Sequence, residues 1–247
     1  MARSKSLTRV HVAEPIPPHG IFDAPPDAAH HLAHVLRLAE GDVLVVFDGR
    51  GLEYPAVVER IGKSGVTLRV SNPSPVDRES PLAVTLAQGI SSGERMDYTV
   101  QKAVELGVYA IQPLATERSV VRLNAERAAK RVAHWQAIAV AACEQSGRNR
   151  VPEVLPVAPV TGWLAHVPAD ALRLTLSPGA ASTLHELDRP SASIQLLVGP
   201  EGGLSPRERE DAHAAGFTPL KLGPRVLRTE TAALAAMAAM QAIWGDF

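Results

Sequence analysis

Hydrophobic and polar positions change their rhythm about a third of the way along the chain. Between residues 43 and 70, apolar side chains recur at nearly every second position, and glycine-containing pairs interrupt them. This pattern predicts three strands joined by tight turns, at 43–47, 52–59 and 66–70. One helix precedes them, with Asp27 as its expected cap and an end before Gly41. Residues 1–75 are therefore predicted to form a small β-rich domain.

Beyond residue 81, short apolar runs alternate with amphipathic stretches of helical period. The runs predict buried strands at 82–88, 108–114, 172–176, 194–198 and 218–222. The amphipathic stretches predict helices at 94–106, 125–146 and 229–244, and Ser205-Pro206-Arg207-Glu208 is a capping box that begins another. Such alternation is typical of an α/β domain with a mainly parallel sheet, here over residues 76–247. Prolines and charges without a hydrophobic period mark 72–81 as the linker.

Two glycine-punctuated turns follow apolar runs near the C-terminus. They read Val198-Gly199-Pro200-Glu201-Gly202-Gly203-Leu204 and Leu222-Gly223-Pro224-Arg225-Val226-Leu227-Arg228. Glycine at the end of a strand lets a ligand approach the main chain, and open α/β sheets bind ligands at that edge. The pair predicts one adenosine-sized site. Neither turn fits Gly-x-Gly-x-x-Gly, which argues against a nucleotide-dependent dehydrogenase.

Composition limits the class of protein but identifies no catalytic group. A hydrophobic fraction of 46%, a single cysteine and a polar start to the chain indicate a soluble, cytoplasmic protein without a disulfide or a membrane span. The net charge of −1 lacks the excess expected of a nonspecific nucleic-acid binder. Between Arg118 and Arg150, however, seven basic residues stand against two acidic ones. That cluster predicts either phosphate contacts or a solvated helix face.

Three other features are interpreted as structural. His30 and His34 have the spacing of a metal pair, but no third ligand stands in a recognised spacing, so no metal site is predicted. Gly62-Lys63-Ser64 resembles the end of a phosphate-binding loop, but Val57 occupies the position that requires glycine. Cys143 is expected to pack inside the long helix rather than to act as a nucleophile.

The sequence resembles the knotted SPOUT methyltransferases, and specifically the bacterial small-subunit ribosomal RNA uridine N3-methyltransferases. Besides the two glycine turns, the matching segments are His34-Val35-Leu36-Arg37, Glu105-Leu106-Gly107-Val108 and the stretch from Ala141 to Pro152. They occur in order along nearly the whole chain. The resemblance implies a trefoil-knotted α/β domain at 76–247, a PUA-like, RNA-binding barrel at 1–75, a homodimer and S-adenosylmethionine as the cofactor.

The resemblance also implies roles for individual residues. The expected cofactor-binding residues are Leu176, Val198, Gly199, Pro200, Glu201, Gly202, Leu222, Gly223 and Leu227. The guanidinium of Arg228 is expected to stabilise the charge that develops when uracil N3 loses its proton, with Arg225 as the second choice. Glu201 would either accept that proton or hold the main chain of its own turn. Thr229 and Glu230 are expected to cap the last helix and complement its dipole.

Five arginines are candidates for RNA contacts, with stabilising surface charge as the alternative: Arg9, Arg37, Arg118, Arg148 and Arg150. The function implied is methylation of uridine N3 in 16S ribosomal RNA. Two alternatives remain, an enzyme of the same fold acting on another RNA such as tRNA, and a non-catalytic RNA-binding assembly factor. The intact glycine turns and Arg228 weigh against the assembly factor.

Overall fold

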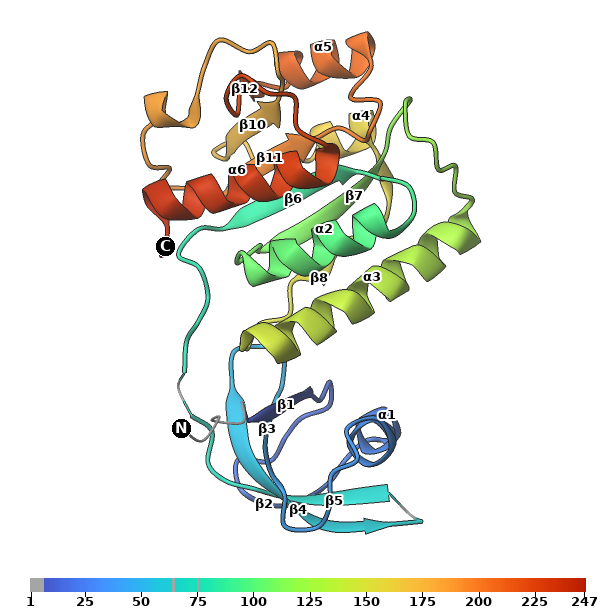
Figure 1. Ribbon diagram of the computed structural model, residues 1–247. Coiled ribbons are helices and arrows are strands. Elements are labelled where there is room, and N and C mark those ends of the chain that lie inside the picture. The colour runs from blue at the N-terminus through green and yellow to red at the C-terminus, as the bar shows by residue number, and fades with distance from the viewer. Residues whose placement is uncertain (1–6, 64, 75) are drawn as a thin grey trace. The chain divides into compact units, whose positions relative to one another are not determined.

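The computed structural model describes residues 7–63, 65–74 and 76–247, and the chain divides into two compact units (Figure 1). The first comprises Met1–Glu79 together with Cys143–Val151, and the second comprises Ser80–Ala142 and Pro152–Phe247. The division falls four residues beyond the predicted boundary. The return of 143–151 to the first unit was not predicted.

The first unit is built on a five-stranded sheet in the order β1-β3-β4-β5-β2. The strands are β1 (Thr8–His11), β2 (Gly20–Asp23), β3 (Val43–Phe47), β4 (Glu53–Gly62) and β5 (Gly65–Val70). β1 runs parallel to β3, and the remaining neighbours are antiparallel. Leu32, Leu44, Val46 and Leu68 are almost fully buried at its core. The three predicted strands are confirmed, whereas the two four-residue strands were missed.

The helix of the first unit differs from its prediction. α1 (Pro26–His30) passes directly into a π-helical turn, His31–Val35. Its cap is Pro25, with no capping side chain, and Asp27 lies inside the first turn, so the predicted cap was wrong. The π-turn leads to Arg37, whose φ is 54°, a conformation that non-glycine residues seldom adopt.

Residues 143–151 are held in the first unit by a buried ionic network. The Arg9 guanidinium lies 2.6 Å from Glu53 and 2.6 Å from the Asn149 amide oxygen. Arg148 forms a two-pronged contact with Glu79, at 3.0 and 2.6 Å. Burial raises the pKa of Glu53, but hydrogen bonds from Arg9, Arg78 and Asn149 outweigh it and leave the pKa below its usual value. Every charge in this cluster is therefore paired, as burial requires.

The second unit has a parallel sheet in the order β12-β10-β11-β6-β7-β8, with β9 also paired to β7. Its strands are β6 (Val84–Gly89), β7 (Ala110–Ala115), β8 (Glu153–Val154), β9 (Ala158–Pro159), β10 (Leu172–Leu176), β11 (Ile194–Val198) and β12 (Thr218–Leu220). Its helices are α2 (Glu94–Glu105), α3 (Ala125–Ser146, whose last turn belongs to the first unit), α4 (Val160–Leu164), α5 (Pro206–Ala214) and α6 (Thr229–Trp244). A 3-10 turn spans Leu184–Glu186.

Parallel strands place their carboxyl ends at one edge of a sheet, and here this brings the functional turns together. β10, β11 and β12 are neighbours, so the loops after them meet although up to 50 residues separate them in the sequence. α6 packs against α2, and the two helices lie side by side in Figure 1. The buried Ala233 and Ala236 allow α6 to approach its neighbours closely. The capping box of α5 is confirmed, with Ser205 and Glu208 bonding reciprocally.

Candidate active site

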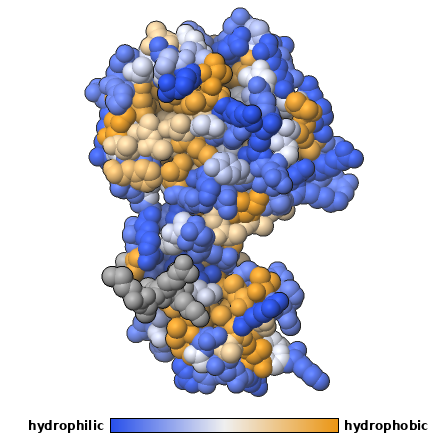
Figure 2. Space-filling view, viewed as in Figure 1, coloured by the Kyte–Doolittle hydropathy of each residue, from blue (hydrophilic) through white to orange (hydrophobic). Residues whose placement is uncertain are grey.

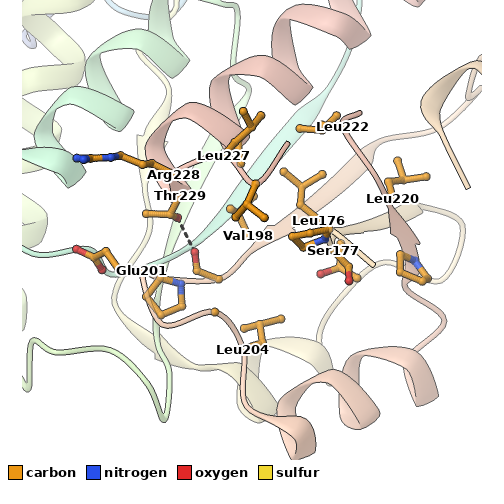
Figure 3. A pocket seen from close by; sticks show the side chains of 18 of the residues that line it. Leu176, Ser177, Val198, Glu201, Leu204, Leu220, Leu222, Leu227, Arg228 and Thr229 are labelled. Atoms are coloured by element: carbon orange, nitrogen blue, oxygen red, sulfur yellow. Dashed lines mark hydrogen bonds between the residues drawn. The ribbon is translucent and has the colours of Figure 1, made fainter. Parts of the chain in front are cut away.

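A cavity of about 690 Å³ opens at the carboxyl ends of β10, β11 and β12, beside the first turn of α6. Its size falls within the range of small-molecule sites. Apolar walls come from the strand ends Leu176 and Val198 and from Leu222 and Leu227 of the loop after β12 (Figure 3). Main-chain groups of glycine turns lie between them. The arrangement suits a flat, partly apolar ligand held by the backbone.

The predicted cofactor residues converge on this cavity with one exception. It is lined by Leu176, Val198, Gly199, Pro200, Glu201, Leu222, Gly223 and Leu227. Gly202 faces away instead, because a Cβ there would lie 3.1 Å from Cβ of Arg118. The Arg118 guanidinium also donates to the Gly202 carbonyl at 3.2 Å. Gly202 thus permits close packing of the turn against Arg118.

The turn after β11 requires glycine at Gly199, and the adjacent strand end requires it at Gly89. A Cβ on Gly199 would lie 2.8 Å from the main-chain nitrogen of Leu204. A Cβ on Gly89, at the end of the adjacent β6, would lie 2.6 Å from the nitrogen of Pro200. Real Cβ atoms do not approach main chain so closely, so either substitution must displace the turn. Glycine here serves close packing of three main-chain segments.

The start of α6 is fastened to that turn. The Thr229 hydroxyl donates to the Gly199 carbonyl at 2.5 Å, the contact drawn as a dashed line in Figure 3. Arg228, and not Thr229, is the N-cap residue, and no side chain caps the helix, so the predicted capping role of Thr229 was wrong. Glu230 does lie in the first turn, where its charge complements the helix dipole.

Glu201 is occupied by donors from another part of the unit. Its carboxylate accepts from the Ser92 amide at 2.8 Å, the Ser92 hydroxyl at 2.7 Å and Arg95 at 2.8 Å. Burial raises the pKa of Glu201, but these hydrogen bonds, together with one to its own main chain, outweigh it and lower the pKa to about 2. A carboxylate with so low a pKa is a weak base at neutral pH. The geometry favours the scaffolding role for Glu201.

Arg95 is a site residue that the sequence did not single out. It is the second residue of α2, lines the cavity, and lies 3.9 Å from Glu230 in addition to its contact with Glu201. It therefore links a carboxylate of the first glycine turn to one in the first turn of α6. Nothing in the local sequence distinguishes Arg95 from a surface charge on an amphipathic helix, because its carboxylate partners stand more than 100 residues away.

Replacement of Glu201 by Gln is expected to lower stability in a pH-dependent way. A carboxyl whose pKa drops from 4.5 to about 2 on folding contributes stability that is complete above about pH 4.5 and is lost as the pH falls toward about 2. Urea unfolding of both proteins should show a difference at neutral pH that shrinks by about pH 3. Glu210→Gln, at an exposed position of α5, is the control. A difference independent of pH would contradict the assignment.

Arg228 is an unpaired cation of the site, and so is Arg225. Both line the cavity and are exposed, and neither guanidinium makes a hydrogen bond or ion pair with the side chains that the structure describes. Arg228 and Glu201 lie on the same side of the cavity (Figure 3). A cation without a partner at the edge of a pocket is available to a ligand, whereas Arg95 is already engaged.

The five arginines predicted to contact RNA fall into two groups. Arg37, Arg118 and Arg150 are exposed. The side chains of Arg9 and Arg148 are only 10% and 7% exposed, and both are paired with carboxylates. That burial speaks against direct phosphate contact by these two and favours the structural alternative.

The cysteine, the histidine pair and the described part of the glycine-lysine-serine motif lie outside the cavity. Cys143 is fully buried, and desolvation raises the pKa of its thiol to about 12, so it is not an activated nucleophile. The rings of His30 and His34 contact each other in a tilted arrangement, with their centroids 4.9 Å apart. In the described part of the chain, no three His, Cys, Asp or Glu side chains are grouped to hold a metal ion. Among those same residues, no helix is long and apolar enough to cross a membrane. Ser64 of the glycine-lysine-serine motif lies outside the described residues.

A parallel α/β unit with its cavity between strand-end turns and a separate small β-sheet unit correspond to the two domains of an RNA methyltransferase. Residues 78–241 match the family described as an RNA methyltransferase domain, and residues 25–71 match the RNA methyltransferase PUA domain. The chain belongs to this RNA methyltransferase family.

Individual relatives narrow the comparison. The ribosomal RNA small subunit methyltransferase E of Buchnera aphidicola, from Schizaphis graminum, is 32% identical over 98% of both chains. The enzyme of that name from Bacillus subtilis is 33% identical over 89% of both. Among solved structures, the Neisseria gonorrhoeae enzyme of that name, bound to S-adenosyl methionine, is 44% identical with a TM-score of 0.92, covering 98% of this chain and 99% of its own.

A putative methyltransferase from Legionella pneumophila, in complex with the same cofactor, is 39% identical with a TM-score of 0.93 and the same coverage. The predicted SPOUT-type methyltransferase fold with an N-terminal PUA-like domain is confirmed by these matches.

Proposed function

We propose that this protein transfers the methyl group of S-adenosylmethionine to N3 of a uridine in small-subunit (16S) ribosomal RNA. The observation that carries the proposal is the cavity between the three strand-end turns, with the unpaired Arg228 at its edge. The relatives named above, one of them bound to S-adenosyl methionine, support the cofactor and the class of substrate.

The residues present fit this cofactor. Leu222 and Leu227 offer apolar surfaces to an adenine ring, and the backbone of the second turn is open, since a Cβ on Gly223 would meet nothing within 4 Å. A third loop, expected from the resemblance at Leu176-Ser177-Pro178-Gly179, follows β10; its first three residues line the cavity and Gly179 does not. Bound there, S-adenosylmethionine supplies a methyl group already activated by its sulfonium. The protein then has to position the base and manage the N3 proton.

Arg228 performs the electrostatic part of the reaction. Loss of the N3 proton places negative charge on the uracil ring, and a guanidinium without another partner stabilises that charge. Glu201 remains ionised and holds the turn through Ser92 and Arg95.

RNA contacts are assigned to the exposed members of the predicted set. Arg37 and Arg150 of the first unit and Arg118 of the second present guanidinium groups to solvent, as phosphate contacts require. Arg118 also touches the Gly202 carbonyl, so it lies next to the cofactor turn. We assign Arg9 and Arg148 an indirect role, in which their ion pairs hold 143–151 and thus Arg150 in place.

The homodimer implied by the resemblance has support in the surface of α6. The helix leaves partly exposed apolar side chains, among them Leu234, Ala238 and Ile243, and an apolar patch lies over it in Figure 2. A second copy of the chain would cover this patch, since exposed apolar patches commonly mark interfaces. The proposed substrate places the protein in the cytoplasm, where ribosomal subunits are assembled.

The proposal is tested by transfer of labelled methyl from S-adenosylmethionine to small ribosomal subunits that lack uridine N3 methylation. We expect incorporation into the small subunit, recovered as 3-methyluridine after digestion, and none into large subunits or tRNA. Incorporation into tRNA alone would preserve the enzyme class and discard the substrate. Absence of transfer to every RNA, despite cofactor binding, would favour the assembly-factor alternative.

A further inference from the structure

Gln88 lies beneath the active site without touching its cavity. It is the penultimate residue of β6, between β11 and β7 in the sheet, and is 0% exposed. Its amide nitrogen is within hydrogen-bonding reach of three acceptors, the Gly89 carbonyl at 2.9 Å, the Thr229 hydroxyl at 3.0 Å and the Gly199 carbonyl at 3.4 Å. Two of these acceptors line the cavity, one from each cofactor turn region.

The hydrogen bonds around Gln88 have a fixed direction. The Thr229 hydroxyl donates its single proton to the Gly199 carbonyl, so toward Gln88 it accepts. A flipped amide would set its oxygen against two carbonyl oxygens. The amide nitrogen of Gln88 and the hydroxyl of Thr229 therefore form a directed bridge from β6, through the start of α6, to the turn after β11.

The amide oxygen of Gln88 indicates the role of this residue. Its amide oxygen is buried and has no hydrogen-bond partner among the described residues. An unpaired buried acceptor costs free energy, so a position that needed only packing would be better filled by an apolar side chain. The amide nitrogen of Gln88, by contrast, has partners, and two of them, Gly199 and Thr229, line the cavity.

We propose that Gln88 is a positioning residue that sets the affinity of the site for S-adenosylmethionine by holding Gly199 and Thr229 in register. Gly199 belongs to one cofactor turn, and Thr229 directly follows the other, at residues 222–228. Main-chain pairing of β11 with β6 ends at Val198, opposite Gln88, so the amide is the side-chain link that joins Gly199 and Thr229 to β6. Without it, the cavity walls that these two segments carry lose part of their relative placement. The inference rests on the proposed function, because it assumes that the cavity binds this cofactor.

The first variant is Gln88→Met, which keeps the length of the side chain and removes its polar end. Removal of hydrogen bonds at a buried site is expected to weaken S-adenosylmethionine binding roughly tenfold or more in calorimetry. Because Gln88 does not touch the reacting groups, KM for the cofactor should rise while kcat at saturation stays within about threefold. Thr229→Val should weaken binding similarly, and Thr229→Ser should restore it.

Gln112 provides a matched control in the adjacent strand. It is also nearly buried, and its amide nitrogen donates to the Pro113 carbonyl at 3.0 Å and the Pro156 carbonyl at 2.8 Å. Neither acceptor lines the cavity. Gln112→Met should therefore lower thermal stability about as much as Gln88→Met does, yet leave cofactor affinity unchanged. A purely structural role for Gln88 would make the two variants alike in both measurements.

The bridge also predicts coupling between its two members. In a Thr229→Val background, Gln88→Met should cost much less affinity than it does alone, because the shared contact is already absent. Full additivity would overturn the proposal, as would a folded Gln88→Met protein with wild-type affinity. If Gln88→Met does not fold, the contrast between Thr229→Val and Thr229→Ser decides. A wild-type protein that fails to bind S-adenosylmethionine would instead overturn the proposed function.

Discussion

An Arg228→Ala protein is expected to lose roughly a hundredfold to a thousandfold in turnover while binding S-adenosylmethionine with unchanged affinity. The guanidinium stands at the edge of the cavity with no partner among the described side chains, so its removal leaves the fold and the cofactor turns intact. What is lost is stabilisation of the charge that develops on the base. Single-turnover methyl transfer and cofactor calorimetry measure the two effects separately.

The control for this variant is Arg207→Ala, at an exposed position of α5 that does not line the cavity. It removes the same charge from the unit and should leave turnover unchanged. Arg228→Lys should recover part of the activity, because an ammonium keeps the charge and loses the planar geometry. An Arg228→Ala protein with full turnover would show that Arg228 does not stabilise the transition state. Arg225 would then be the next candidate for that role.

Gly199→Ala is expected to weaken S-adenosylmethionine binding by roughly tenfold to a hundredfold. The added Cβ would lie 2.8 Å from the main-chain nitrogen of Leu204, so the turn must open. The Gly199 carbonyl would then lose its place beside Thr229. Calorimetry with the cofactor measures the loss, and thermal unfolding reports how much of the strain reaches the fold.

Gly179→Ala is the matched control for Gly199→Ala. Gly179 follows the third cofactor loop, and a Cβ there would meet no atom within 4 Å. Its substitution should leave both cofactor affinity and stability near those of the wild type. Equal effects of the two substitutions would mean that the close packing around Gly199 does not shape the site.

The pattern of hydrophobic residues predicted a helix or strand correctly where the segment itself contains the periodicity and the boundary residues. β10, β11, α3 and α6 were predicted with the bounds that the structure shows, because each couples a buried run or a helical period to a clear boundary residue. β1, β2, β8 and β9 were missed, since segments of two to four residues carry too little pattern and exist through pairing with a neighbour. The prediction of Asp27 as the cap was wrong because α1 already begins at Pro26, with Pro25 as its N-cap.

The residues of the site also divide into those with a local sequence signal and those that tertiary contacts place there. The glycine turns and Arg228 were recognisable in the sequence, because glycine at the end of a strand has few other uses. Arg95 and Gln88 were not, because each contributes through partners over 100 residues away, and nothing in the flanking residues records such a contact. The buried state of Arg9 and Arg148 was hidden for the same reason, since their carboxylate and amide partners come from other segments.

The sequence by itself predicted the α/β fold and the two glycine turns, because local periodicity and glycine at strand ends signal them, while Arg228 was singled out through the resemblance to a known family. Only the tertiary structure decided which charges are free and which are engaged. It shows the Glu201 carboxylate engaged by Ser92 and Arg95, buries the side chains of Arg9 and Arg148, and places Gln88 beneath the cavity. Ionisation and hydrogen bonding depend on distance in space, and only folding sets that distance.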